Sequence, residues 1–280
     1  MLSTISVAAA LAAAALTAQA GPITVKGSDT MVILAQKWAE VYMNSHTNIK
    51  IEVNGGGSGV GLAALQNGQV DIADASRTMK NQEIDNFVKT YNKRPREYKV
   101  AMDGLSVYVN KDNPVKALDL DQLQAVFTGK IKNWKEVGGN DTPITIYSRE
   151  NTSGSYEFFK EHVLKGKDFA ASAQTMPGTA ALVQAVEKDK NGIGYGGASY
   201  GVNTRALGVK KDAASPAIEP TEETVVGRAY PIWRYLYVYL NPDSDKGDIA
   251  AYLNWIRSDA GQAVVKENSY YPLPKELREK

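Results

Sequence analysis

The 280-residue sequence predicts an α/β fold with largely parallel sheets. Short β-type runs alternate with helical stretches along the whole chain. The helical stretches carry apolar residues at intervals of three and four, so each has one face to bury. Hydrophobic residues make up 43% of the chain, which is enough to form an ordinary globular core.

The elements follow one another in a regular order. A strand at 23–25 leads into a helix over 31–44 whose apolar residues share one face. Further strands are expected at 49–53, 70–75, 105–110, 144–147, 193–195 and 235–240. Further helices are expected at 60–66, 77–88, 120–127, 153–164, 179–188 and 249–258.

The first twenty residues are expected to be a signal peptide. An apolar run from Val7 to Leu16 precedes Ala18-Gln19-Ala20, which fits the cleavage rule before Gly21. The run is shorter than the ~20 residues that a spanning helix needs, which disfavours a membrane anchor. The usual basic segment before the run is missing, so it stays open whether Met1 is the true start. The expected product is a soluble periplasmic protein.

Composition narrows the function classes. Lys and Arg number 32 and Asp and Glu 31, and this balance argues against a nucleic-acid or membrane-surface binder. The chain has no cysteine, which excludes thiol catalysis, disulfides and lipid attachment at Cys.

Several strand-to-helix turns contain residues that are suited to binding a ligand. Three of them are rich in Gly, Ser and Thr: Gly27-Ser28-Asp29-Thr30, Gly57-Ser58-Gly59 and the segment from Arg149 to Ser155. A fourth strand end, Asp74-Ala75-Ser76-Arg77, has the same polar character. The first turn of a helix has free N–H groups and partial positive charge, so such turns bind phosphate-like anions. Each turn alone is commonly a helix cap, but several together favour an oxyanion site.

Motifs of nucleotide-binding proteins and hydrolases are either incomplete or lie in the wrong sequence context. Residues 57–65 lack the Gly-Lys-Ser/Thr of a nucleotide-binding loop. The G-x-G-x-x-G pattern of 192–197 follows a charged helical stretch rather than a strand. The G-x-S-x-G pattern of 197–201 has no histidine after it, as a hydrolase would need. His46 and His162 are expected to be structural, and we expect no metal and no cofactor.

At these turns the sequence resembles the PstS family, the periplasmic phosphate-binding proteins of ABC importers. The resemblance covers essentially the whole mature chain. Its landmarks are Gly27-Ser28-Asp29-Thr30, Gly55-Gly56-Gly57-Ser58-Gly59, residues 71–77, Phe127-Thr128-Gly129-Lys130-Ile131 with Trp134 and Gly138-Gly139, residues 149–155, and Gly192-Ile193-Gly194-Tyr195.

The resemblance implies a type II periplasmic-binding-protein fold, in which two α/β lobes are joined by two crossing strands and hold the ligand between them. We expect lobe 1 to comprise residues 21–102 and 235–280, and lobe 2 residues 103–234. The strands at 105–110 and 235–240 are the expected hinges. Phosphate would be bound without catalysis by a monomer and passed to an inner-membrane ABC permease.

Carried over position by position, the resemblance implies a set of ligand-binding residues drawn from both lobes. They are Ser28, Asp29, Thr30, Ser58, Ser76, Arg77, Arg149, Ser153, Gly154 and Ser155. Arg149 is the expected main counter-charge, since its planar fork suits a tetrahedral oxyanion.

One departure bears on the choice of anion. Ser76 stands where the best-known members carry an aspartate that accepts the proton of hydrogen phosphate. Sulfate has no such proton near pH 7, so an acceptor carboxylate rejects it. Asp29 could supply the acceptor or could instead cap the helix that follows it, and the sequence leaves both open. A same-fold receptor for sulfate, molybdate or tungstate remains an alternative, and a secreted phosphate-ester hydrolase is a weaker one.

Overall fold

A computed structural model describes residues 21–278, so the expected signal peptide lies outside the described residues. The larger strands are β1 (Ile23–Gly27), β2 (Ile51–Asn54), β3 (Ile72–Ala75), β4 (Arg96–Asn110), β6 (Thr145–Arg149), β8 (Gly192–Gly197) and β11 (Trp233–Leu240). Short strands are β5 (Ala117–Asp119), β7 (Gln174–Met176), β9 (Thr204–Ala206) and β10 (Gly208–Lys210). The helices are α1 (Val32–Ser45), α2 (Ser58–Gln66), α3 (Asn81–Tyr91), α4 (Leu120–Phe127), α5 (Gly154–His162), α6 (Gly178–Lys188), α7 (Glu222–Val226), α8 (Gly247–Arg257) and α9 (Asp259–Glu267).

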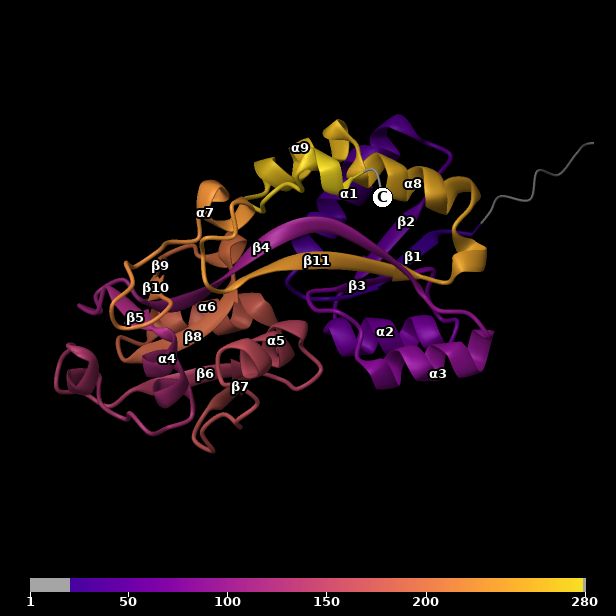
Figure 1. Ribbon diagram of the computed structural model, residues 1–280. Helices are drawn as coiled ribbons and strands as arrows, with labels where there is room; N and C mark the ends of the chain where they lie inside the picture. The colour runs from indigo at the N-terminus through magenta and orange to yellow at the C-terminus, as the bar shows by residue number, and fades with distance from the viewer. Residues whose placement is uncertain (1–20, 279–280) are drawn as a thin grey trace, which may run out of the picture.

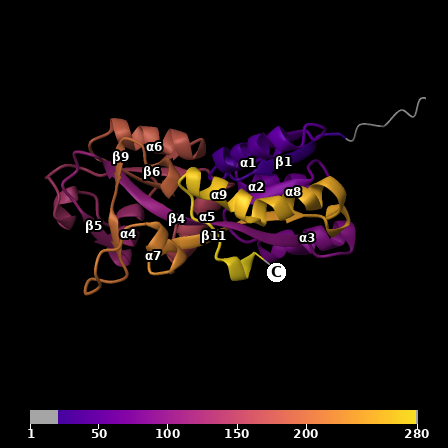
Figure 2. The same cartoon turned by 90° about the horizontal axis from the view of Figure 1, so that it is seen from above.

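The molecule has two lobes, which β4 and β11 join (Figure 1). In lobe 1, β1 lies between β2 and β3 and is parallel to both, and β11 continues the sheet antiparallel to β3. Leu34 and Trp38 of α1 pack with α8 and α9 on one face of this sheet. Leu62 of α2 and Phe87 of α3 pack on the other face. Figure 2 shows α1, α8 and α9 together at one end of the molecule.

Lobe 2 is built on β8, β6 and β7, with the second half of β4 along one side. Strand β6 is parallel to both β7 and β8. Phe127 of α4 and Phe159 of α5 contribute to the core on one face of the sheet. Leu182 and Val186 of α6 cover the other face.

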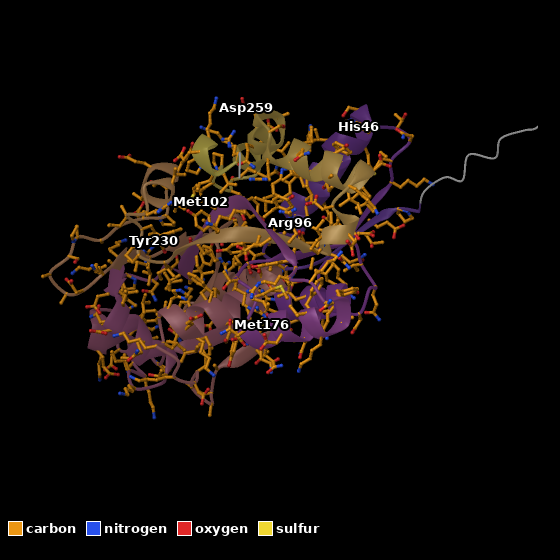
Figure 3. All side chains as sticks on the ribbon, turned by 45° about the vertical axis from the view of Figure 1, so that its right-hand side comes forward. His46, Arg96, Met102, Met176, Tyr230 and Asp259 are labelled. Atoms are coloured by element: carbon orange, nitrogen blue, oxygen red, sulfur yellow. The ribbon has the colours of Figure 1, made fainter. Side chains whose placement is uncertain are left out.

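Strand β4 takes part in both sheets. Its residues 96–104 pair antiparallel with β11, and residues 105–110 pair antiparallel with β8 and β9. At about 3.3 Å per residue its 15 residues reach roughly 50 Å, which is enough to run through both lobes. Figure 3 labels Arg96 at its start and Met102 near the passage between the lobes.

The expected hinge strands lie in β4 and β11, the two strands that cross between the lobes, but the extent of β4 and the strand directions differ from the expectation. The expected hinge strand 105–110 is only the second half of β4, because the polar residues at its start hid the rest of the strand. The sheets are parallel in their outer parts but antiparallel around β4 and β11, where the chain returns through the crossing. The expected boundary between residues 102 and 103 falls inside β4.

Candidate functional site

Three hydroxyl groups of lobe 1 meet at the ends of its parallel strands. Ser28 follows β1, Ser76 follows β3, and Ser58 begins α2. The Ser28 hydroxyl donates to Ser76 Oγ over 2.9 Å, and Ser58 Oγ accepts from the Ser76 backbone N–H over 3.0 Å. All three side chains are buried. The carboxyl ends of parallel strands share one edge, which is where α/β proteins bind ligands.

Lobe 2 contributes the first turn of α5. Ser153 caps this helix by accepting from the Tyr156 backbone N–H over 3.3 Å. Ser155 Oγ lies 2.9 Å from the hydroxyl of Thr30 in lobe 1. A Cβ added to Gly154 would lie 2.3 Å from Ser58 Oγ, so only a glycine lets the two lobes approach this closely. We call Ser28, Thr30, Ser58, Ser76, Ser153 and Ser155 the hydroxyl cluster.

Two helix N-termini face each other across the cluster. The backbone N–H of Gly59, in the first turn of α2, donates to the Thr152 carbonyl just before α5 over 3.0 Å. Helix N-termini carry partial positive charge and N–H groups without partners inside the helix. Their convergence with buried hydroxyls makes a site whose chemistry suits a tetrahedral oxyanion.

A buried ion pair that sequence reasoning missed adjoins the cluster. Arg234 of β11 lies opposite Asp103 of β4 in the antiparallel register. Its Nε and Nη2 donate to Asp103 Oδ2 over 2.9 and 2.8 Å. Arg234 also donates to the Ser76 carbonyl over 3.1 Å and to Ser155 Oγ over 2.9 Å. A guanidinium therefore contacts cluster residues of both lobes.

Arg149, the expected main counter-charge, pairs with carboxylates of both lobes. Its Nη2 pairs with Asp29 of the opposite lobe over 2.8 Å and with Glu150 over 2.9 Å, and its Nη1 donates to Thr179 over 2.9 Å. None of these groups belongs to the hydroxyl cluster. Burial opposes the charge on Arg149, but the bonds to Glu150 and Asp29 outweigh it and raise its pKa.

Asp29 does not cap the helix that follows it. The cap residue of α1 is Met31, and no side chain bonds to the first turn there. The Asp29 carboxylate instead accepts from the Gly56 backbone N–H over 2.8 Å, and Arg149 binds its other oxygen. The capping alternative is therefore wrong, because the turn directs this carboxylate toward the glycine loop and lobe 2.

Comparison with known proteins identifies the family. The PBP superfamily domain matches residues 12–260. The phosphate-binding protein PstS of Pseudomonas aeruginosa is 35% identical over 278 residues, covering 93% of this chain and 85% of that protein. Its counterpart in Staphylococcus aureus is 34% identical, covering 89% of this chain and 77% of that protein. The chain belongs to the PstS family of phosphate-binding proteins.

Solved structures of related proteins have the same fold. A phosphate ABC transporter substrate-binding protein of Clostridium perfringens, solved with bound phosphate, has a TM-score of 0.83 at 29% identity and covers 91% of this chain and 100% of its own. An ABC-type phosphate transport receptor of Vibrio cholerae has a TM-score of 0.72 at 25% identity, with 90% and 100% covered. The α/β periplasmic-binding-protein fold is thereby confirmed.

The remaining expected ligand residue, Arg77, is held in an ion pair beside the first turn of α2. Its Nη1 and Nη2 form a two-pronged pair with Glu83 of α3 at 2.8 and 2.7 Å, and Nη1 also donates to the Thr78 carbonyl. Burial would raise the pKa of Glu83, but the bonds to Arg77 and to the Lys80 backbone lower it. The structure therefore brings together the expected serines, Thr30 and Gly154, and holds the guanidinium of Arg77 in an ion pair.

The histidines lie apart from this cluster. The ring of His46 stacks on Tyr42 at the end of α1, and that of His162 stacks on Phe158 in α5. Within residues 21–278, no three His, Cys, Asp or Glu side chains are grouped to hold a metal ion. None of the helices in that range is long and apolar enough to cross a membrane.

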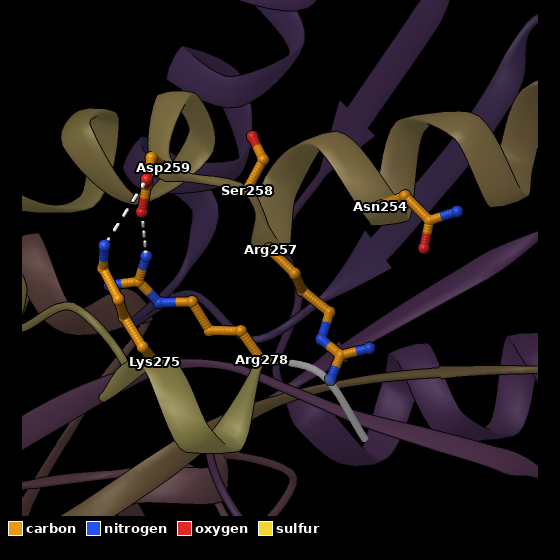
Figure 4. A pocket seen from close by; sticks show the side chains of 6 residues that line it. All are labelled: Asn254, Arg257, Ser258, Asp259, Lys275 and Arg278. Carbon is orange, nitrogen blue, oxygen red and sulfur yellow. Dashed lines mark hydrogen bonds and ion pairs between the residues drawn. The ribbon is translucent and has the colours of Figure 1, made fainter.

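A polar pocket lies on lobe 1, at the junction of α8 and α9 (Figure 4). Asp259 receives Arg278 at 2.7 Å and Lys275 at 3.8 Å there. These pairs attach the C-terminal segment to α9. Asp259 is strongly exposed, so we assign the pairs a small structural role.

Proposed function

We propose that this protein captures inorganic phosphate at the hydroxyl cluster, between its two lobes, and delivers it to an ABC-type permease. The observation that carries the proposal is the meeting of buried hydroxyls and helix N-termini from both lobes. The relatives named as phosphate-binding proteins, and the related structure solved with phosphate, support the same ligand. As a member of the PstS family the protein is a receptor and not an enzyme.

The proposed ligand-binding set keeps the expected serines, Thr30 and Gly154, and adds Arg234. It leaves out Asp29, Arg77 and Arg149, whose charged groups form ion pairs. Ser28, Thr30, Ser58 and Ser76 would bind from lobe 1, and Ser153, Gly154 and Ser155 from lobe 2. Arg234 joins them as the cation in contact with the cluster. Hydrogen bonds to a charged group contribute about 1.5–3 kcal/mol each, so several of them offset desolvation and closure and reach micromolar affinity or tighter.

Arg149 and Asp29 act on closure in this proposal. They connect the lobes directly, as do the Thr30–Ser155 contact, the Gly59–Thr152 hydrogen bond and a bond of 2.6 Å from the Tyr200 hydroxyl to the Asp29 carbonyl. Phosphate would favour the closed form because both lobes bind it. The lobes would move as 21–102 with 235–280 and as 103–234, with β4 and β11 bending at the crossing.

Export to the periplasm belongs to the same proposal. An expected signal peptide precedes the described residues, and the sequence has no cysteine for lipid attachment. The permease is the partner that this role requires, and a monomer is sufficient for it. Fractionation of the native host, with the protein released by osmotic shock, would test the location.

Calorimetric titration of phosphate-free protein tests the proposed ligand. We expect a saturable isotherm for phosphate, much weaker binding of sulfate and molybdate, and no release of phosphate from a generic ester. Sulfate that displaces phosphate at equal concentration would favour the receptor for another oxyanion. Steady release of phosphate from an ester would favour the hydrolase.

A further inference from the structure

Asp103 and Arg234 are single charges in apolar stretches of β4 and β11. Asp103 is the one charged residue in 100–110, and Arg234 is the one charged residue of β11. Their side chains are 1% and 2% exposed, and charges are buried this deeply only when they are paired or functional. The pair lies at the crossing strands, where β4 passes from one sheet to the other.

Arg234 connects the pair to the hydroxyl cluster. Besides its bonds to Asp103, it donates to the Ser76 carbonyl, to Ser155 Oγ and, over 3.4 Å, to Thr30 Oγ1. Among the described side chains it is the cation that donates to the cluster hydroxyls. An anion bound by these hydroxyls would therefore lie next to the Arg234 guanidinium.

Asp103 has one oxygen with acceptor capacity to spare. Oδ2 takes both bonds from Arg234, while Oδ1 accepts only a long bond of 3.3 Å from the Ala198 backbone N–H. A carboxylate oxygen has two lone pairs, so Oδ1 can accept another donor. A Cβ placed on Gly197 would lie 3.2 Å from Oδ1 and 3.0 Å from the Thr30 methyl group, so Asp103 and Thr30 approach the same point.

The other carboxylates near the cluster are less suitable acceptors. Both oxygens of Asp29 already accept bonds of 2.8 Å, and its side chain is 17% exposed. No described side chain donates to the carboxylate of Asp74, whose neighbours across β3 are Gly27 and Val238. Of these three carboxylates, Asp103 is the one that binds a side chain, Arg234, which in turn donates to cluster residues.

We propose that Asp103 is the carboxylate that selects protonated phosphate, and that Arg234 donates hydrogen bonds to the other oxygens of the bound anion. This inference rests on the proposed function. The P–O–H of hydrogen phosphate donates to Asp103 Oδ1, and the unprotonated oxygens accept from Arg234 and the hydroxyls. Sulfate would place an oxygen lone pair against Oδ1 without a proton between them, in a site that excludes water.

The test compares Asp103→Asn with Asp29→Asn as the matched control, using calorimetry with phosphate and with sulfate. Wild type should prefer phosphate strongly. Asp103→Asn should lose phosphate affinity by roughly 10- to 100-fold, the loss of one charge-assisted bond, and gain relative affinity for sulfate. Asp29→Asn should keep the wild-type ratio of the two affinities.

The outcomes separate the inference from the proposed function. An unchanged ratio of phosphate to sulfate affinity in Asp103→Asn overturns the inference, whether or not both affinities fall together. Wild type that binds no phosphate overturns the proposed function instead. Removing one partner can destabilise a buried pair, so the double variant Asp103→Asn, Arg234→Gln is the second test, and it should also lose the preference for phosphate.

Discussion

Gly154 allows a direct test of lobe closure. An alanine Cβ at this position would lie 2.3 Å from Ser58 Oγ and 2.5 Å from Ser76 Oγ, both on the opposite lobe. The first turn of α5 accommodates alanine at least as well as glycine, since alanine is the better helix former by about 1 kcal/mol. The substitution should therefore leave lobe 2 folded and act only where the lobes meet.

The size of the effect follows from the contacts across the interface. Real Cβ atoms keep more than 3.0 Å from such neighbours, so either the two serine hydroxyls rotate out of their hydrogen bonds or the lobes separate by about 1 Å. That shift weakens the Thr30–Ser155 hydrogen bond and the donors that α5 would offer to an anion. Losing one or two charge-assisted bonds of about 1.5–3 kcal/mol each predicts at least a tenfold loss of phosphate affinity.

Calorimetry on Gly154→Ala, with Gly59→Ala as the graded control, measures this loss. A Cβ on Gly59 would lie 3.3 Å from the Thr152 carbonyl, so only a small movement is required and we expect less than a tenfold loss. Melting temperature without phosphate should stay near the wild-type value in both variants. Wild-type affinity in Gly154→Ala would refute the reasoning, since it would mean that phosphate binds without this contact.

Three further predictions concern charged groups. Arg149→Ala should weaken phosphate binding about 100-fold or more by removing the buried pair with Asp29, and in a double-mutant cycle with Asp29→Ala the two losses should not add. Burial raises the pKa of Asp74 to about 8, so ionising this group should lower the stability of the wild type as pH rises from 4 to 8. Asp74→Asn should remove up to about 5 kcal/mol of this fall, as measured by denaturant unfolding at several pH values. Parallel curves of stability against pH for the two proteins would contradict the prediction. Lys80→Ala removes a partly exposed pair with Glu157 across the lobes, so calorimetry should find less than a fivefold loss that shrinks further in high salt.

The order of strands and helices could be predicted from the sequence because local periodicity sets it. The helix at 120–127 has the expected bounds, and others differ by a few residues. Helix α9 was missed because Ser258, taken as the end of α8, also caps the next helix by accepting from the Gly261 backbone N–H. The antiparallel crossing of β4 and β11 depends on long-range pairing, which periodicity does not encode.

The types of residue that donate hydrogen bonds in the site could be predicted from the sequence, but their partners could not. Glycine, serine and threonine after a strand mark a turn that exposes N–H groups, wherever the turn lies in the fold. Which group an arginine side chain pairs with depends on the tertiary structure. Arg149 was expected to meet the anion, and the sequence did not indicate that it would pair with Asp29 and Glu150. Arg234 had a detectable signal, a lone charge in an aromatic strand, which indicates a buried partner.

Because both of these arginines are paired with carboxylates, binding of an anion does not depend on a net positive charge. Arg234 is matched by Asp103, and Arg149 by two carboxylates, so neither leaves a net positive charge beside the cluster. The attraction must then come from oriented N–H groups and hydroxyls and from the near face of the Arg234 guanidinium. Such donors act over hydrogen-bond distances and in fixed directions, whereas a net charge attracts any anion. The affinity and specificity for an anion therefore depend on how closely the two lobes approach each other. For this reason a single methyl group added at Gly154 is expected to reduce phosphate affinity more than the loss of an exposed ion pair.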